Sequence, residues 1–203
     1  MATEVKMELR KRSDGVLRAI ITSADKPIKN MCRDRIEYWN KARAYLMRAG
    51  DFREIWVEIN SQGGSLDSAI GITLALCQRK EPMKILIDGR CDSAATLLLE
   101  LPAPCYITDK SGIYIHSPCT QRYQRQKDGE YKLIKTEKFA LSAARSYFSS
   151  AYKIRAKQSG KKLKRKTIKD WLLKGARFTA LEAVQVGLAN HVTTRTEFEK
   201  GAL

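Results

Sequence analysis

Residues 53–89 read REIWVEINSQGGSLDSAIGITLALCQRKEPMKILIDG, and this stretch decides the fold class. Its first eight residues alternate and are rich in β-branched side chains, which predicts a strand. SQGGS at 61–65 predicts a glycine turn, and residues 66–80 predict a helix. KILIDG at 84–89 is a short apolar run, typical of a parallel strand covered on both faces. Together these segments predict an α/β domain with a mainly parallel sheet.

The flanking segments extend this pattern in both directions. Upstream we expect a polar, loosely held terminus over 1–15, a strand over 16–22 and a helix over 31–47. Downstream we expect a helix over 92–101, strands in PCYITD and GIYIHSP, a hairpin over 122–135 turned at Asp128-Gly129, a long helix over 138–160, shorter helices around 167–174 and 180–187, and a strand or turn in NHVTT. The 203 residues fit a single domain.

The formal charge of +16 is unevenly distributed. Residues 153–169 read KIRAKQSGKKLKRKTIK and contain no Asp or Glu. This run is either a solvated helix end with a loop, or a docking surface for an acidic partner or nucleic acid. It contains no aromatic residue, so it does not indicate a stacking platform for single-stranded nucleic acid.

The cysteine pattern and the hydropathy of the chain indicate in which cellular compartment we expect it. The five cysteines form no C-x-x-C pair, which favours free thiols in a reducing compartment: Cys32, Cys77, Cys91, Cys105 and Cys119. Two histidines argue against a mixed Cys/His zinc site. No apolar run reaches the ~20 residues that span a bilayer, and the N-terminus lacks a signal core. We therefore expect a cytoplasmic protein without a metal.

Two segments can carry chemistry at strand ends. In GRCDSAA, residues 89–95, a strand ends and Ser93 opens an apolar helix. Ser93 is either a helix N-cap or a nucleophile exposed at the carboxyl edge of the sheet, where the Ala94 N–H can steady an oxyanion. The N–H groups of Gly63 and Gly64 can act as anion donors, although ordinary tight turns have the same composition.

A catalytic serine needs a base and an orienting carboxylate, and the chain offers few candidates for either. The chain has two histidines, and His116 closes an apolar strand while His191 falls in an expected surface turn, so His116 is the better base. Between Glu137 and Glu182 the one acidic residue is Asp170, which makes it the candidate orienting carboxylate. The alternative interpretation of Asp170 is an acid in the first turn of a helix.

Four segments, taken in order, resemble the ClpP family of serine peptidases within the wider ClpP/crotonase fold. INSQGGS is similar to the family's INSPGG element, GRCDSAATLLL to its G-x-A-A-S-x-A segment, GIYIHSP to its M-I-H-x-P segment, and ARFTALEAVQVGLANHV to its C-terminal segment. The resemblance covers residues 53–192. It implies a spiral of repeated β-β-α units with a mainly parallel sheet and a protruding handle helix. One domain would span 1–203, with its head at 16–118 and 165–195 and its handle region at 119–164.

The resemblance also implies roles for individual residues. Ser93 would attack a peptide carbonyl, His116 would move the proton, Asp170 would orient the imidazole, and the Gly64 and Ala94 N–H groups would form the oxyanion hole. No metal or organic cofactor is implied. The expected substrates are peptides or unfolded proteins, cleaved in a cytoplasmic homo-oligomeric ring (a heptamer or tetradecamer) that an AAA+ unfoldase can feed. Nucleic acid is the weaker alternative partner.

Some positions depart from the family pattern and resemble divergent phage or bacterial members. Asp92 replaces a small residue and, if it pointed inward, would raise the pKa of His116 or repel an oxyanion. The family's catalytic aspartate falls nearer Leu172 than Asp170, and its glycine-rich substrate strand after the histidine is absent. The alternatives are therefore a catalytically silent scaffold subunit or a crotonase-type acyl-CoA enzyme.

Overall fold

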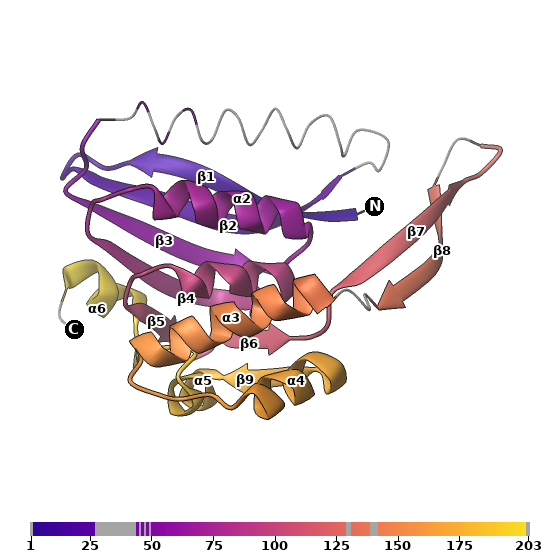
Figure 1. The fold of residues 1–203 in the computed structure, drawn as a ribbon. Helices are drawn as coiled ribbons and strands as arrows, with labels where there is room; N and C mark the ends of the chain where they lie inside the picture. Colours follow the sequence, from indigo (N-terminus) through magenta and orange to yellow (C-terminus); the bar gives the residue numbers. More distant parts are fainter. Residues whose placement is uncertain are drawn as a thin grey trace.

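The computed structural model describes residues 2–26, 44, 46, 48, 50–128, 131–138 and 142–201. Its strands are β1 (Ala2–Lys11), β2 (Val16–Lys26), β3 (Glu54–Ser61), β4 (Met83–Asp92), β5 (Cys105–Thr108), β6 (Gly112–Ile115), β7 (Cys119–Arg125), β8 (Tyr131–Lys138), β9 (Ala176–Thr179) and β10 (His191–Thr193). Its helices are α2 (Leu66–Cys77), the 3₁₀ helix η2 (Ser93–Glu100), α3 (Ser142–Gln158), α4 (Arg165–Lys174), α5 (Ala180–Val186) and α6 (Arg195–Lys200). Figure 1 shows the β7–β8 hairpin projecting from the body, while α3 lies between η2 and α4.

The main sheet is mixed and largely parallel, as the sequence predicts. Strands β2, β3, β4, β5 and β10 pair in parallel in that order. Beyond β5, the last part of β4 pairs in parallel with β6, which in turn pairs antiparallel with β9. Because β3, β4 and β6 run in one direction, their carboxyl ends meet at one edge of the sheet. The segments that follow these three strands carry the glycine turn, Ser93 and His116.

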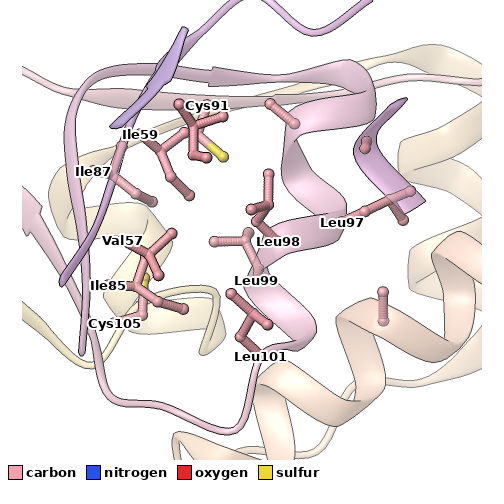
Figure 2. Close-up of a cluster of buried hydrophobic side chains, with 14 of the residues drawn as sticks. Val57, Ile59, Ile85, Ile87, Cys91, Leu97, Leu98, Leu99, Leu101 and Cys105 are labelled. Atoms are coloured by element: carbon pink, nitrogen blue, oxygen red, sulfur yellow. The ribbon is translucent and has the colours of Figure 1, made fainter. Parts of the chain in front are cut away.

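The main core lies between this sheet and the helices on one of its faces. Figure 2 shows Leu98 and Leu99 of η2 reaching toward apolar side chains of β3 and β4, including Ile59 and Ile87. All four of these side chains are almost completely buried. Burial of apolar surface on this scale is the main stabilising contribution to the fold, and it fixes η2 against the sheet.

Part of the opposite face of the sheet is covered by α6. Ile85 and Ile87 of β4 belong to the main core, whereas Leu86 between them packs with Trp56 and Phe198 on the other face. The rings of Trp56 and Phe198 meet edge to face at 5.3 Å. Burial on both faces explains why β4 has no polar alternation, as the sequence predicts.

The expectation of a loosely held terminus over residues 1–15 was wrong. Strand β1 pairs antiparallel with β2 along its whole length, from Ala2 opposite Lys26 to Lys11 opposite Leu17. The physical reason is an apolar alternation at Val5, Met7 and Leu9, of which Met7 is 4% exposed.

Other expectations need smaller changes. The helix expected over 92–101 is a 3₁₀ helix, and the long helix begins at Ser142 because Lys138 still belongs to β8. Strand β9 and helix α6 were not anticipated, whereas the hairpin pairing of β7 with β8 is confirmed. Most of the helix expected over 31–47 lies outside the described residues, as does Gly129 of the hairpin turn.

Candidate active site

Ser93 stands where β4 ends and η2 begins, and its backbone is strained. It has φ of +54° and is the one non-glycine residue with positive φ among those described. Such a conformation costs about 1–3 kcal/mol and is concentrated at functional sites. Ser93 is partly exposed between the buried Asp92 and Ala94. The observed strain points to a function for Ser93 beyond capping a helix.

The glycine turn lies directly against this serine. Gly63 and Gly64 have φ of +85° and +143°, which few residues other than glycine adopt. A Cβ atom on Gly63 would lie 2.5 Å from the carbonyl oxygen of Asp92, 2.7 Å from the Cβ of Ser93 and 3.0 Å from the nitrogen of Ala94. Glycine is therefore required here for a close approach between backbones.

Two serines hold the glycine turn in place. The Ser23 hydroxyl accepts a hydrogen bond from the Gln62 N–H (2.8 Å) and donates to the Gly63 carbonyl (3.0 Å). The Ser61 hydroxyl accepts from the Gly63 N–H (3.1 Å) and shares a 2.7 Å hydrogen bond with Ser23. Among the described residues nothing accepts from the Gly64 N–H, which leaves that donor available. Sequence reasoning missed Ser23, because its contact depends on the pairing of β2 with β3.

His116 follows β6 at the same edge of the sheet. The β4–β6 pairing places Asp92 opposite Tyr114, so Ser93 and His116 both lie just beyond the ends of neighbouring parallel strands. The His116 Nδ1 atom lies 2.8 Å from the Ser117 carbonyl oxygen. Because a carbonyl oxygen can only accept, Nδ1 is the donor in this contact, and in a neutral imidazole that tautomer leaves Nε2 as the acceptor that a general base requires. The ring also packs against that of Tyr114 at 5.1 Å.

A backbone carbonyl of helix α4 accepts a hydrogen bond from the residue that follows His116. The buried Ser117 hydroxyl donates to the Leu172 carbonyl at 2.7 Å. Within the described residues, no hydrogen bond or ion pair joins Asp170 or Ser93 to His116. The role of Asp170 as the third catalytic residue therefore stays a prediction. Sequence spacing gave no signal for the Ser117 contact, which links segments 55 residues apart.

The carboxylate of Asp92 is neutralised by its neighbour on the same strand. The Arg90 Nε and a terminal guanidinium nitrogen lie 2.7 and 2.5 Å from Asp92 Oδ2. The Asp92 side chain is 6% exposed, so this ion pair accounts for a buried charge beside Ser93. Pairing with Arg90 removes the objection that an unpaired acid would repel an oxyanion.

The other end of the serine turn is held by α3. The Thr96 hydroxyl donates to the Ser93 carbonyl at 2.5 Å and shares a 2.7 Å hydrogen bond with the Tyr152 hydroxyl. Burial raises the pKa of Tyr152 far above its usual value, so this phenol stays neutral and can donate. The contact was not foreseen from the sequence, because it requires α3 to pack on η2.

Other chemistry-bearing groups are poorly placed for catalysis. The Cys91 thiol is fully buried and burial raises its pKa, so it is not a reactive thiolate. His191 begins β10, at the opposite end of the strands from Ser93, and stacks on Tyr106. Within the described ranges there is no group of three or more potential metal ligands and no helix able to cross a membrane.

The fold and this sheet edge define a class, namely ClpP-type α/β proteins. The Clp protease family model matches residues 28–196, and the chain belongs to the Clp protease family. Among solved structures it is similar to a point mutant of ClpP1 from Listeria monocytogenes, with a TM-score of 0.53 and 15% identity over 81% of this chain and 85% of that one. At this identity the likeness shows the fold alone. No curated protein sequence matches the chain.

Proposed function

We propose that the protein is a serine endopeptidase of the Clp type, with Ser93 as nucleophile and His116 as general base. The observation that carries this proposal is the left-handed backbone of Ser93 at the end of β4, packed against Gly63. His116 lies beyond the neighbouring parallel strand, with its Nδ1 atom directed at the Ser117 carbonyl. Membership of the Clp protease family favours peptide bonds over acyl-CoA esters as the substrate.

The chemistry follows from these atoms. The Ser93 hydroxyl oxygen forms a bond to the peptide carbonyl carbon while its proton passes to His116 Nε2. The N–H groups of Gly64 and Ala94 would stabilise the oxyanion. The peptide C–N bond then breaks as His116 returns the proton to the leaving amine, and water hydrolyses the acyl-enzyme by the reverse roles.

The imidazole needs a partner that holds its Nδ1 proton throughout this cycle. In the structure the Ser117 carbonyl lies 2.8 Å from Nδ1 and can accept a hydrogen bond from it. Asp170, the carboxylate assigned from the sequence, lies on α4 two residues before Leu172. We propose the Ser117 carbonyl as the partner of Nδ1, with Asp170 as the alternative that the Asp170→Asn variant tests.

The assembly and location belong to the same proposal. We infer a homo-oligomeric ring, a heptamer or a pair of heptamers, that works in the cytoplasm on unfolded proteins and can accept them from an AAA+ unfoldase. Membership of the Clp protease family supports this assembly. Native mass spectrometry of the purified chain measures the ring size, and a monomer at all concentrations would contradict the assembly.

A catalytically silent subunit is the second candidate. The observation in its favour is that no described carboxylate hydrogen-bonds to His116, while the apolar Leu172 stands near where the family's aspartate falls. Such a subunit would keep the fold and the ring contacts while leaving peptides intact.

Active-site labelling separates the two candidates. We expect a fluorophosphonate probe to modify assembled wild-type protein at Ser93, as mapped by peptide mass spectrometry. The His116→Ala variant should label far more slowly, because it lacks the base. Absence of labelling in a properly assembled ring would overturn the peptidase and support the silent subunit.

A further inference from the structure

A basic cavity of about 910 Å³ lies between α3 and α4. Its charged lining consists of Arg145 and Lys153 from α3 and Arg165, Lys166 and Lys169 from α4, with serine hydroxyls and two leucines between them. This volume is within the range of ligand sites. Four of these five cations belong to the basic run over residues 153–169, for which the sequence allowed two interpretations.

The positive charge of this cavity is not compensated within the described part of the chain. None of the five cations makes an ion pair there, and no acidic side chain lines the cavity. The Arg145 Nε atom is buried and has no hydrogen-bond acceptor. Because the protein itself covers this Nε atom, it does not face the cavity, and it is the charge of the five lining cations that favours an anionic ligand.

The walls of the cavity are the helices that brace the proposed catalytic residues. Leu172 lines the cavity, and its carbonyl accepts the hydrogen bond from Ser117, the neighbour of His116. On α3, Lys153 follows Tyr152. The Tyr152 hydroxyl hydrogen-bonds to the Thr96 hydroxyl, which in turn donates to the Ser93 carbonyl. A ligand in the cavity would therefore contact the helices that position both ends of the site.

We propose that this cavity binds Asp and Glu side chains of the peptide substrate, so that the protein prefers substrates that carry acidic segments. This inference rests on the proposed function, because it places the peptide at Ser93. Carboxylates match the unpaired guanidinium and ammonium groups. A nucleic-acid strand fits less well, because none of the described residues that line the cavity is an aromatic one that could stack on its bases.

The test compares two variants of equal charge. In the cavity variant, Lys166→Gln and Lys169→Gln remove two lining cations. In the control variant, Lys157→Gln and Lys162→Gln remove two exposed cations outside the lining. Both are made in a Ser93→Ala background so that bound peptide stays intact, and both are checked for unchanged thermal unfolding.

Fluorescence anisotropy then measures binding of a labelled Glu-rich peptide and of its Gln-substituted counterpart. We expect the Glu peptide to bind about tenfold more weakly to the cavity variant, with less than a twofold change in the control variant. The Gln peptide should bind weakly to both. Equal binding of the Glu peptide to the two variants would overturn the inference.

A cleavage arm and an oligonucleotide arm complete the test. In the Ser93 protein, kcat/KM for a Glu-flanked peptide should exceed that for the Gln-flanked peptide, and this preference should vanish in the cavity variant. Cleavage without such a preference would overturn the inference alone, whereas cavity-dependent binding without cleavage would overturn the proposed peptidase alone. A labelled single-stranded oligonucleotide that binds more tightly than the Glu peptide, and loses affinity in the cavity variant, would overturn the assignment to peptides.

Discussion

The strand side of the candidate site, around Ser93, is tied by several hydrogen bonds and a close backbone approach, whereas on its α4 side, among the described residues, one side-chain hydrogen bond ties the His116 segment to α4. On the strand side, Ser93 is fixed between Gly63, which tolerates no side chain, and Thr96. On the α4 side, the Ser117 hydroxyl reaches the Leu172 carbonyl. A strained backbone persists only where its surroundings over-determine it, which explains why the serine turn needs dense support. The predictions below test this difference.

The largest effect is expected at the strained serine itself. Ser93→Ala and Ser93→Gly should each lower kcat/KM by about 10³-fold or more, because the nucleophile is lost. Ser93→Gly should nevertheless be more stable than Ser93→Ala by about 1 kcal/mol, since glycine adopts φ of +54° without strain. Urea unfolding measures this difference, and equal stability of the two variants would show that the serine turn is not strained.

A methyl group on Gly63 should break the close approach on the strand side. Gly63→Ala adds an atom 2.5 Å from the Asp92 carbonyl oxygen, so we expect a loss of about 3 kcal/mol and about 10²-fold in kcat/KM. Gly160→Ala is the matched control, because Gly160 also has positive φ (+70°) but open space around it. It should cost about 1 kcal/mol and leave activity unchanged. Equal costs at both positions would contradict the packing argument.

Strand β3 of the same side is also anchored through Glu58 on the far face of the sheet. Burial alone would raise the pKa of Glu58, but hydrogen bonds from Arg18 and Arg195 outweigh it and hold the pKa below the usual value. A carboxyl whose pKa falls on folding stabilises the protein above its ordinary pKa of 4.5, and this contribution disappears as pH falls through the folded-state pKa.

The variant Glu58→Gln should therefore lower stability at pH 7 by about 2 kcal/mol. The gap to wild type should narrow as the pH falls below about 4. Urea unfolding at pH 7 and pH 3.5 measures both. Glu199→Gln, which removes an exposed carboxylate 3.4 Å from Arg195, should change stability by less than about 0.5 kcal/mol. If the difference in unfolding free energy between wild type and Glu58→Gln grew as the pH fell, the pKa of Glu58 would not be lowered by folding.

The same contrast explains how much could be foreseen from the sequence. The position of Ser93 and His116 at one sheet edge was predictable, because carboxyl ends of parallel strands share an edge and local patterns mark each strand end. The contacts that hold them were not, since Ser23 to Gly63 and Ser117 to Leu172 join segments 40 and 55 residues apart. Such pairs depend on strand register and helix packing, which a local pattern does not encode. The assignment of Asp170 had only the scarcity of acids behind it.

The smallest effect is expected on the α4 side and compares Ser117→Ala with Asp170→Asn. Ser117→Ala leaves the carbonyl that accepts from His116 but removes its tie to Leu172, so the imidazole is held less firmly. We expect kcat to fall about tenfold with little change in KM. Asp170→Asn should lower kcat less than threefold, because no hydrogen bond joins Asp170 to His116 in the described chain.

Steady-state kinetics on an unstructured peptide, with the pH profile of kcat, measure both variants. Fluorophosphonate titration counts the active sites, so that kcat can be expressed per labelled site. If the role of Ser117 were merely structural, Ser117→Ala would lower stability but leave kcat per labelled site unchanged. The α4 side would have to be reassigned if Asp170→Asn lost about 10⁴-fold, the magnitude expected when an orienting carboxylate is removed. In that event α4 would have to move toward His116 during catalysis, and the weakly held side of the site would be its adjustable part.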